Sequence, residues 1–180
     1  KSDVREIARK NSLVVAEKPD SQEICFIPHN NYSVFLKEEG VEPRRGMIID
    51  TSGRVLGHHE GFFNYTIGQR EGLGISTGKR LYVIRLDAMT NTVIVGPEEE
   101  TYSSEFFVKD LNWFVPVSES EVIECYVKVR YRGNETPCSC EILSNNRVRV
   151  VLHTPAKAVT PGQAAVFYDG DLLLGGGWIE

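Results

Sequence analysis

The residue best placed to do chemistry is a cysteine within the stretch Lys18-Pro19-Asp20-Ser21-Gln22-Glu23-Ile24-Cys25-Phe26-Ile27-Pro28. Polar, turn-prone residues lead into a short apolar segment that Pro28 stops, a pattern that predicts a loop feeding a brief strand. Cys25 would then lie where the loop becomes rigid, and a reactive thiol needs both that access and that positioning. The same position also fits a small buried hydrophobic residue. Both interpretations stay open at this point.

The other three cysteines, Cys125, Cys138 and Cys140, show no spacing typical of a disulfide framework. In a reducing compartment we expect them to be free thiols. A single Cys-x-Cys without a second Cys or His pair gives weak support for zinc. We therefore expect no metal site at these cysteines.

A glycine-rich run from Gly57 to Gly74 carries further polar candidates. Adjacent His58 and His59 could serve acid–base or metal chemistry, but the pattern favours hydrogen bonds that hold the loop. Three more side chains in the run could contact a base or a phosphate: Tyr65, Gln69 and Arg70. A structural role is equally open for Tyr65.

Two short helices and a hairpin surround these segments. The capping and apolar spacing predict one helix over residues 2–10 and a second from Asn30 or Asn31 to Gly40. Ser52-Gly53 supplies the turn of a hairpin over residues 46–57. Beyond Lys79 we expect strands near 81–87, 92–96, 106–114, 121–131, 138–144, 147–153, 164–168 and 172–175.

Even spacing of short strands is typical of a small closed barrel. The fold class is therefore mainly β with short helices (α+β). We expect a small central α+β domain over residues 1–78, with the polar joint 76–80 leading to a C-terminal antiparallel β-barrel of six to eight strands over residues 79–180.

The composition is that of an ordinary globular protein, with 41% hydrophobic and 25% charged residues in a chain of 180. There is no apolar run long enough to span a bilayer and no signal-peptide pattern, so we expect a cytoplasmic protein without a membrane partner. A net charge of −5 argues against non-specific coating of nucleic acid. The first residue is Lys, and the chain is expected to be a fragment of a longer protein.

Two strands nevertheless carry basic residues at alternating positions. Period two places Lys128, Arg130 and Arg132 on one face and Tyr131 on the opposite, apolar face. In 147–150 both arginines face outward and both valines inward. These faces fit either the solvated outside of a barrel or a nucleic-acid contact.

Three motifs in order closely resemble the tRNA-specific 2-thiouridylase family: residues 20–27, residues 57–75 with Tyr65-Thr66-Ile67-Gly68-Gln69-Arg70, and residues 158–177 with Thr160-Pro161-Gly162-Gln163. The resemblance covers nearly the whole chain. It implies a sulfurtransferase that replaces the 2-oxygen of the wobble uridine in Lys, Glu and Gln tRNAs, using ATP to adenylate that oxygen. It also implies a barrel similar to those of translation elongation factors.

By the resemblance, Cys25 carries the persulfide, supplied by a cysteine desulfurase or a sulfur-relay protein, and Arg130, Tyr131 and Gln163 contact tRNA. The family's second cysteine has no match among Cys125, Cys138 and Cys140. The family's pyrophosphate loop is also absent, so ATP is expected to bind outside this chain, which alone should be inactive. The alternative function is a non-catalytic RNA-binding β-barrel.

Overall fold

The structure is a computed structural model that describes residues 2–17, 27, 32–131 and 133–180. Its contacts divide the chain into two compact units, Lys1–Pro43 and Arg44–Glu180. No helix in the described ranges is long and apolar enough to cross a membrane.

The first unit contains the helices α1 (Ser2–Lys10) and α2 (Tyr32–Glu38) and the 3-10 turn η1 (Val14–Glu17). Asp3 in the first turn of α1 and the basic residues in its last turn complement the helix dipole. The Asn11 side chain donates 2.8 Å to the carbonyl of Ile7 and so caps the end of α1. The expected helix over residues 2–10 is confirmed.

The second unit begins with a four-stranded sheet of β1 (Gly46–Asp50), β2 (Val55–His59), β3 (Tyr82–Asp87) and β4 (Thr92–Gly96). The strand order is β2-β1-β4-β3, in which β1 and β4 run parallel and the other pairs run antiparallel. Asp50 Oδ1 accepts 3.0 Å hydrogen bonds from the N–H groups of Ser52 and Arg54, which fixes the turn of the expected hairpin. One face of the sheet packs a small core of Ile48, Leu73, Val83, Val93 and Val95.

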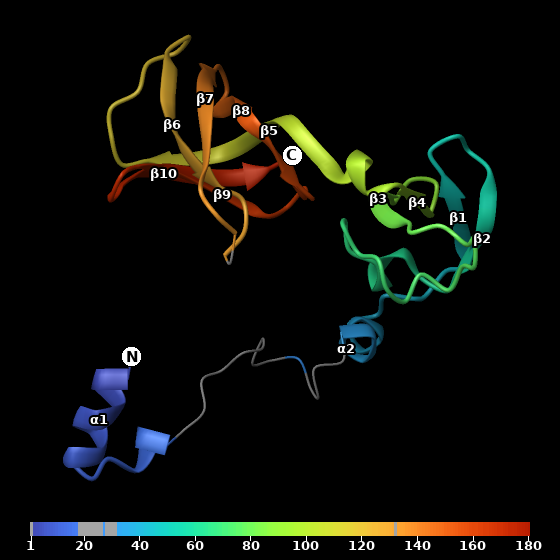
Figure 1. Ribbon diagram of the computed structural model, residues 1–180, viewed down its shortest axis with the longest axis horizontal. Coiled ribbons are helices and arrows are strands. Elements are labelled where there is room, and N and C mark those ends of the chain that lie inside the picture. Colours follow the sequence, from blue (N-terminus) through green and yellow to red (C-terminus); the bar gives the residue numbers. More distant parts are fainter. Residues whose placement is uncertain (1, 18–26, 28–31, 132) are drawn as a thin grey trace. The chain divides into compact units, whose positions relative to one another are not determined.

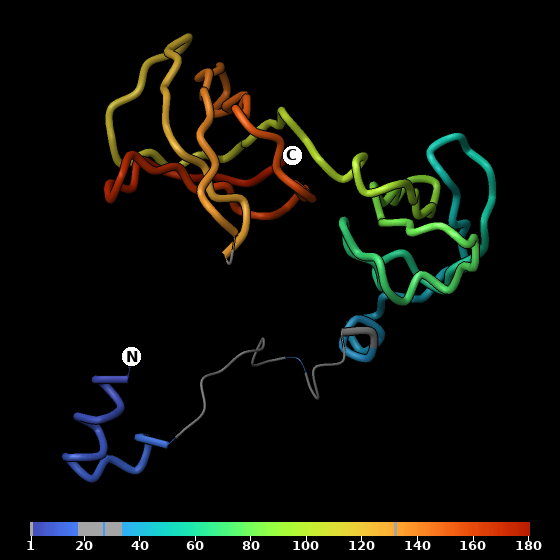
Figure 2. Tube along the Cα trace, viewed as in Figure 1, coloured from blue at the N-terminus to red at the C-terminus, as the bar shows by residue number. Residues whose placement is uncertain are grey.

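The rest of the unit is a closed six-stranded antiparallel barrel, drawn in yellow to red in Figures 1 and 2. Its strands are β5 (Tyr102–Trp113), β6 (Val122–Lys128), β7 (Thr136–Leu143), β8 (Arg147–Lys157), β9 (Ala164–Asp169) and β10 (Leu172–Ile179). They close in the order β10-β5-β8-β7-β6-β9. The expected fold class, with a barrel of six to eight strands, is confirmed.

The assignment of the first two expected strands to the barrel is wrong. Residues 82–87 and 92–96 form β3 and β4, and β4 pairs with β1 in the four-stranded sheet. β4 is buried along its whole length, so its sequence carries no alternation that distinguishes one sheet from another.

Two 3-10 turns complete the unit, η3 (Phe62–Asn64) before β3 and η4 (Glu98–Thr101) before β5. The division at residues 78 and 79 stays a prediction.

Candidate functional site

Cys25, the residue expected to act as the sulfur carrier, lies outside the described residues. Of the surrounding stretch, only Ile27 is described, and its side chain is buried. The role of Cys25 therefore stays a prediction.

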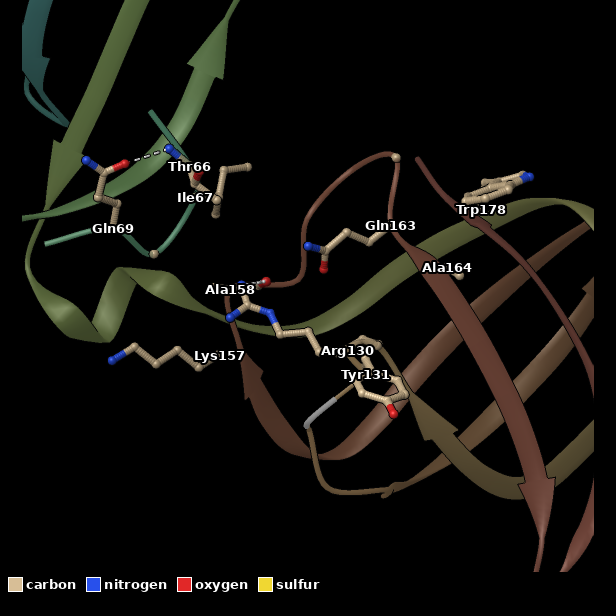
Figure 3. A pocket seen from close by; sticks show the side chains of 13 residues that line it. Thr66, Ile67, Gln69, Arg130, Tyr131, Lys157, Ala158, Gln163, Ala164 and Trp178 are labelled. Carbon is tan, nitrogen blue, oxygen red and sulfur yellow. Dashed lines mark hydrogen bonds between the residues drawn. The ribbon is translucent and has the colours of Figure 1, made fainter. Parts of the chain in front are cut away.

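A cavity of about 720 Å³ lies in the second unit and brings together the other three expected site residues, Arg130, Tyr131 and Gln163 (Figure 3). Four short segments and one residue of β10 line it: residues 66–69 of the glycine-rich loop, 129–131 after β6, 157–158 at the end of β8, 162–164 at the start of β9, and Trp178. These segments are separated by up to about a hundred positions in sequence. Only the folded unit makes them one site.

Arg130 lies just beyond the end of β6, where its side chain is held by the backbone of another segment. Its Nη2 donates a 2.8 Å hydrogen bond to the carbonyl oxygen of Ala158. Thr160 Oγ1 donates to the same oxygen at 2.9 Å. No acidic side chain in the described ranges forms an ion pair with Arg130. Arg130 therefore presents an oriented positive charge without a neutralising partner.

Tyr131 does not lie on the inward face that strict alternation predicts. Cys125, Val127 and Val129 are buried, as expected, but Tyr131 is 93% exposed. The strand ends at Lys128 and the chain bends at Arg130, so period two no longer applies at position 131. The tyrosine ring thus borders the cavity from a turn.

Gln163 closes a tight turn whose geometry the sequence predicts well. Its N–H donates 3.2 Å to the carbonyl of Thr160, and Gly162 between them has φ +82°. Proline followed by a glycine with positive φ is typical of a type II turn. Within the described ranges the Oε1 of Gln163 is buried without a hydrogen-bond partner, and Gln163 is one of the residues that line the cavity.

Lys157, the other cation of the cavity, is already neutralised. Its Nζ bonds Glu98 and lies 4.8 Å from the centre of the Tyr82 ring. The Tyr82 hydroxyl donates 3.1 Å to Glu98. Hydrogen bonding from Lys157, and then from Tyr82, lowers the pKa of Glu98. Lys157 therefore fixes the strand end and leaves Arg130 as the available charge.

The glycine-rich loop uses its polar side chains mainly on itself. Gln69 accepts 2.9 Å from the Thr66 N–H and donates 2.8 Å to the carbonyl of Glu71. Arg70 pairs with Glu71 at 3.1 Å. Tyr65 lies edge-on to the ring of His59 with centroids 5.7 Å apart, and burial raises its pKa. For these side chains the described contacts are structural.

His59 is buried and ties the loop to the sheet. Its Nδ1 accepts 3.1 Å from the N–H of Gly61, so Nε2 carries the proton and donates 3.2 Å to the carbonyl of Asn91. Burial lowers its pKa. His58 is exposed. The hydrogen-bonding interpretation of this pair is confirmed for His59.

The alternation in residues 147–150 is confirmed, with both valines buried and both arginines partly exposed. Arg149 makes two 2.9 Å hydrogen bonds to Glu105 and a 3.4 Å contact to Glu141. Arg147 pairs with Glu180. These partners neutralise the stripe and favour a solvated barrel face.

Sequence reasoning missed several residues of the cavity, among them Ala158 and Trp178. Ala158 is buried with φ +54° and supplies the carbonyl that holds Arg130. Trp178 is 52% exposed and offers an aromatic surface on β10. An alanine gives no sequence signal for a positive φ, and the exposure of Trp178 depends on where β10 ends in the barrel.

Three family models match successive parts of the chain. Residues 103–179 match the aminomethyltransferase beta-barrel domain, residues 33–97 the tRNA methyl transferase PRC-barrel domain, and residues 1–29 the tRNA methyl transferase HUP domain.

Curated relatives match across the whole chain. The tRNA-specific 2-thiouridylases of Geobacter metallireducens and Carboxydothermus hydrogenoformans are each 48% identical to all of it, over 49% and 50% of their own lengths. That of Acetivibrio thermocellus is 47% identical over 50% of its length. The chain thus spans about half the length of these relatives, and it belongs to the tRNA-specific 2-thiouridylase family.

Proposed function

We propose that this chain is the tRNA-holding part of a tRNA-uridine 2-sulfurtransferase and that the cavity around Arg130 and Gln163 binds RNA. The observation that carries this proposal is that Arg130 and Gln163 line one cavity. Among the described residues, the Arg130 guanidinium is oriented by Ala158 and has no ion-pair partner, and the buried Oε1 of Gln163 has no hydrogen-bond partner. A buried polar atom without a partner costs free energy. A ligand that draws the Gln163 amide toward the cavity and donates a hydrogen bond to Oε1 would recover that cost.

The chemistry of the cavity suits RNA. A guanidinium binds phosphate oxygens with charge-assisted hydrogen bonds. The Gln163 acceptor can bond a ribose 2′-hydroxyl or a base N–H, both of which RNA presents. The exposed rings of Tyr131 and Trp178 offer flat surfaces on which unpaired bases stack.

For the reaction we propose Cys25 as the carrier of a persulfide supplied by a cysteine desulfurase or sulfur-relay protein. A second cysteine thiolate attacks the inner sulfur, closes a disulfide with Cys25 and releases hydrosulfide. Hydrosulfide adds to C2 of the uridine, and the adenylated 2-oxygen leaves as AMP. ATP supplies the adenylate and loses pyrophosphate, outside this chain. The choice of Lys, Glu and Gln tRNAs and a cytoplasmic location stay predictions.

The RNA site is tested by comparing Arg130→Ala with Arg149→Ala, which removes the same charge from a side chain already paired with Glu105 and Glu141. We expect Arg130→Ala to weaken tRNA binding and to reduce the slope of log affinity against log salt by about 1. Arg149→Ala should change the tRNA affinity and the salt slope much less. Equal losses in the two variants would show a diffuse electrostatic effect and contradict the proposed site.

The sulfur-carrier role is tested separately, by Cys25→Ser in the full-length enzyme. We expect loss of 2-thiouridine in tRNA, measured by nucleoside mass spectrometry, with tRNA affinity unchanged. Full retention of 2-thiolation would exclude Cys25 as carrier and favour the alternative of a non-catalytic RNA-binding barrel.

A further inference from the structure

Three thiols meet inside the barrel, away from the RNA cavity and without a part in the proposed reaction. The Sγ atoms of Cys125 and Cys140 are 3.5 Å apart, and that of Cys138 is 3.7 Å from each of the other two. All three are free, and all are buried among the aliphatic and aromatic residues of the barrel core.

The strand register explains why they converge. Cys125 of β6 lies directly opposite Cys138 of β7. Cys140 follows two positions later on β7, so its side chain points to the same inner face. The three sulfurs thus form a triangle that bridges two adjacent strands. A register slip of one residue would turn the β7 thiols out of the core.

The triangle has the dimensions of a metal–thiolate site. Tetrahedral coordination with metal–sulfur bonds of about 2.3 Å places thiolate sulfurs about 3.8 Å apart. The three observed separations are within a few tenths of an ångström of that edge. We propose that Cys125, Cys138 and Cys140 form a buried three-thiolate site for a thiophilic metal ion of the Zn²⁺ or Cd²⁺ type.

The donor set restricts the class of ion. Thiolates are soft ligands that select zinc and similar ions over magnesium or calcium. No His, Asp or Glu of the described ranges joins the group. The site therefore provides three protein ligands and leaves the fourth coordination position open. Its apolar surroundings exclude competing water and carboxylates.

Metal binding here would join β6 to β7 through three side chains. The Cys125-bearing strand β6 also runs into the Arg130 turn of the RNA cavity. An ion bound only by the folded barrel raises its stability in proportion to the logarithm of ion concentration over the dissociation constant. We therefore expect the ion to stabilise the barrel.

The test is a titration of the reduced Cys25→Ser chain with Cd²⁺ alone. Binding is monitored through the sulfur-to-cadmium charge-transfer absorption in the ultraviolet. The Cys25→Ser background removes the fourth thiol. We expect one Cd²⁺ per chain and a raised thermal midpoint. Cys140→Ala and Cys125→Ala each remove one ligand. Each should weaken Cd²⁺ binding by at least 10- to 100-fold, which is the loss typical of removing a residue that only hydrogen-bonds to a metal ligand.

Val150→Ala is the matched control, because Val150 is equally buried and lies opposite Cys140 on β8. It removes core volume without removing a thiol and should keep the absorption band. Circular dichroism shows which variants retain the fold. The proposal is overturned if the reduced, folded Cys25→Ser chain gives no band, or if the band persists unchanged in Cys140→Ala and Cys125→Ala.

Discussion

Arg130 and Ala158 are 28 positions apart in sequence, yet the guanidinium of one donates a 2.8 Å hydrogen bond to the carbonyl of the other. Ala158 is itself held, because its N–H donates 2.7 Å to the carbonyl of Thr101. The chain therefore orients the Arg130 charge through backbone contacts, and no acidic side chain in the described part of the chain forms an ion pair with it.

Gln163→Leu should separate function from stability. Removing a buried acceptor without a partner avoids a desolvation penalty of about 1–3 kcal/mol, so the free energy of unfolding should be unchanged or higher by on the order of 1 kcal/mol. The affinity for tRNA should fall. Denaturant unfolding and tRNA titration measure the two effects.

Gln69→Leu is the control for the stability effect of that substitution, because both the oxygen and the nitrogen of the Gln69 amide form a hydrogen bond within its loop. Losing its two hydrogen bonds should lower the free energy of unfolding by about 1–3 kcal/mol. A destabilised Gln163→Leu protein would mean that the Gln163 side chain has a structural role that the unpartnered oxygen does not reveal.

Tyr131→Ala should leave stability within about 0.5 kcal/mol, because an exposed side chain outside any packed contact contributes little. Binding to tRNA should weaken by about 1–3 kcal/mol if one base stacks on the ring. Tyr131→Phe keeps the ring and should bind like the unaltered chain. Equal losses in both variants would assign the effect to the hydroxyl instead of stacking.

Gly68→Ala should destabilise the second unit more than Gly78→Ala does. Both glycines have positive φ, +84° and +69°, so both substitutions cost about 1–2 kcal/mol of backbone strain. A Cβ on Gly68 would lie 2.7 Å from the Cβ of Ala158, whereas one on Gly78 meets nothing within 4 Å. Overpacking should add about 1–3 kcal/mol at Gly68 alone. Equal thermal midpoints for the two variants would show that the loop moves away from Ala158 at little cost.

His59 should make stability depend on pH. Burial lowers its folded pKa below the ordinary 6.5, so the unfolded chain binds the proton more tightly. The stabilisation is therefore complete above about pH 6.5 and is lost as the pH falls through the lowered folded pKa, because protonating Nδ1 breaks the bond from Gly61. Denaturant unfolding at neutral pH and near pH 5 measures this loss of stability.

His59→Gln should lower stability at neutral pH and flatten the dependence below pH 6.5. An undiminished slope in His59→Gln would assign the acid sensitivity to other groups.

Local chemistry made several features predictable from the sequence. The helix over residues 2–10, the hairpin turn after Asp50, the Thr160–Gln163 turn and the alternation in 147–150 each depend on neighbours a few positions apart. Family motifs pointed to Arg130 and Gln163 as site residues, although neither motif shows what those side chains contact. At such short range, residue type and spacing determine the backbone conformation.

Pairings between distant segments were decided only by the tertiary structure. The parallel contact of β1 with β4 removed two strands from the expected barrel, and the early end of β6 turned Tyr131 outward. The same is true of the Arg130–Ala158 bond, the Lys157–Glu98 pair and the convergence of three thiols from two strands. These contacts depend on strand register and on which strands become neighbours, and both are set by burial of the whole core instead of by any local run of residues.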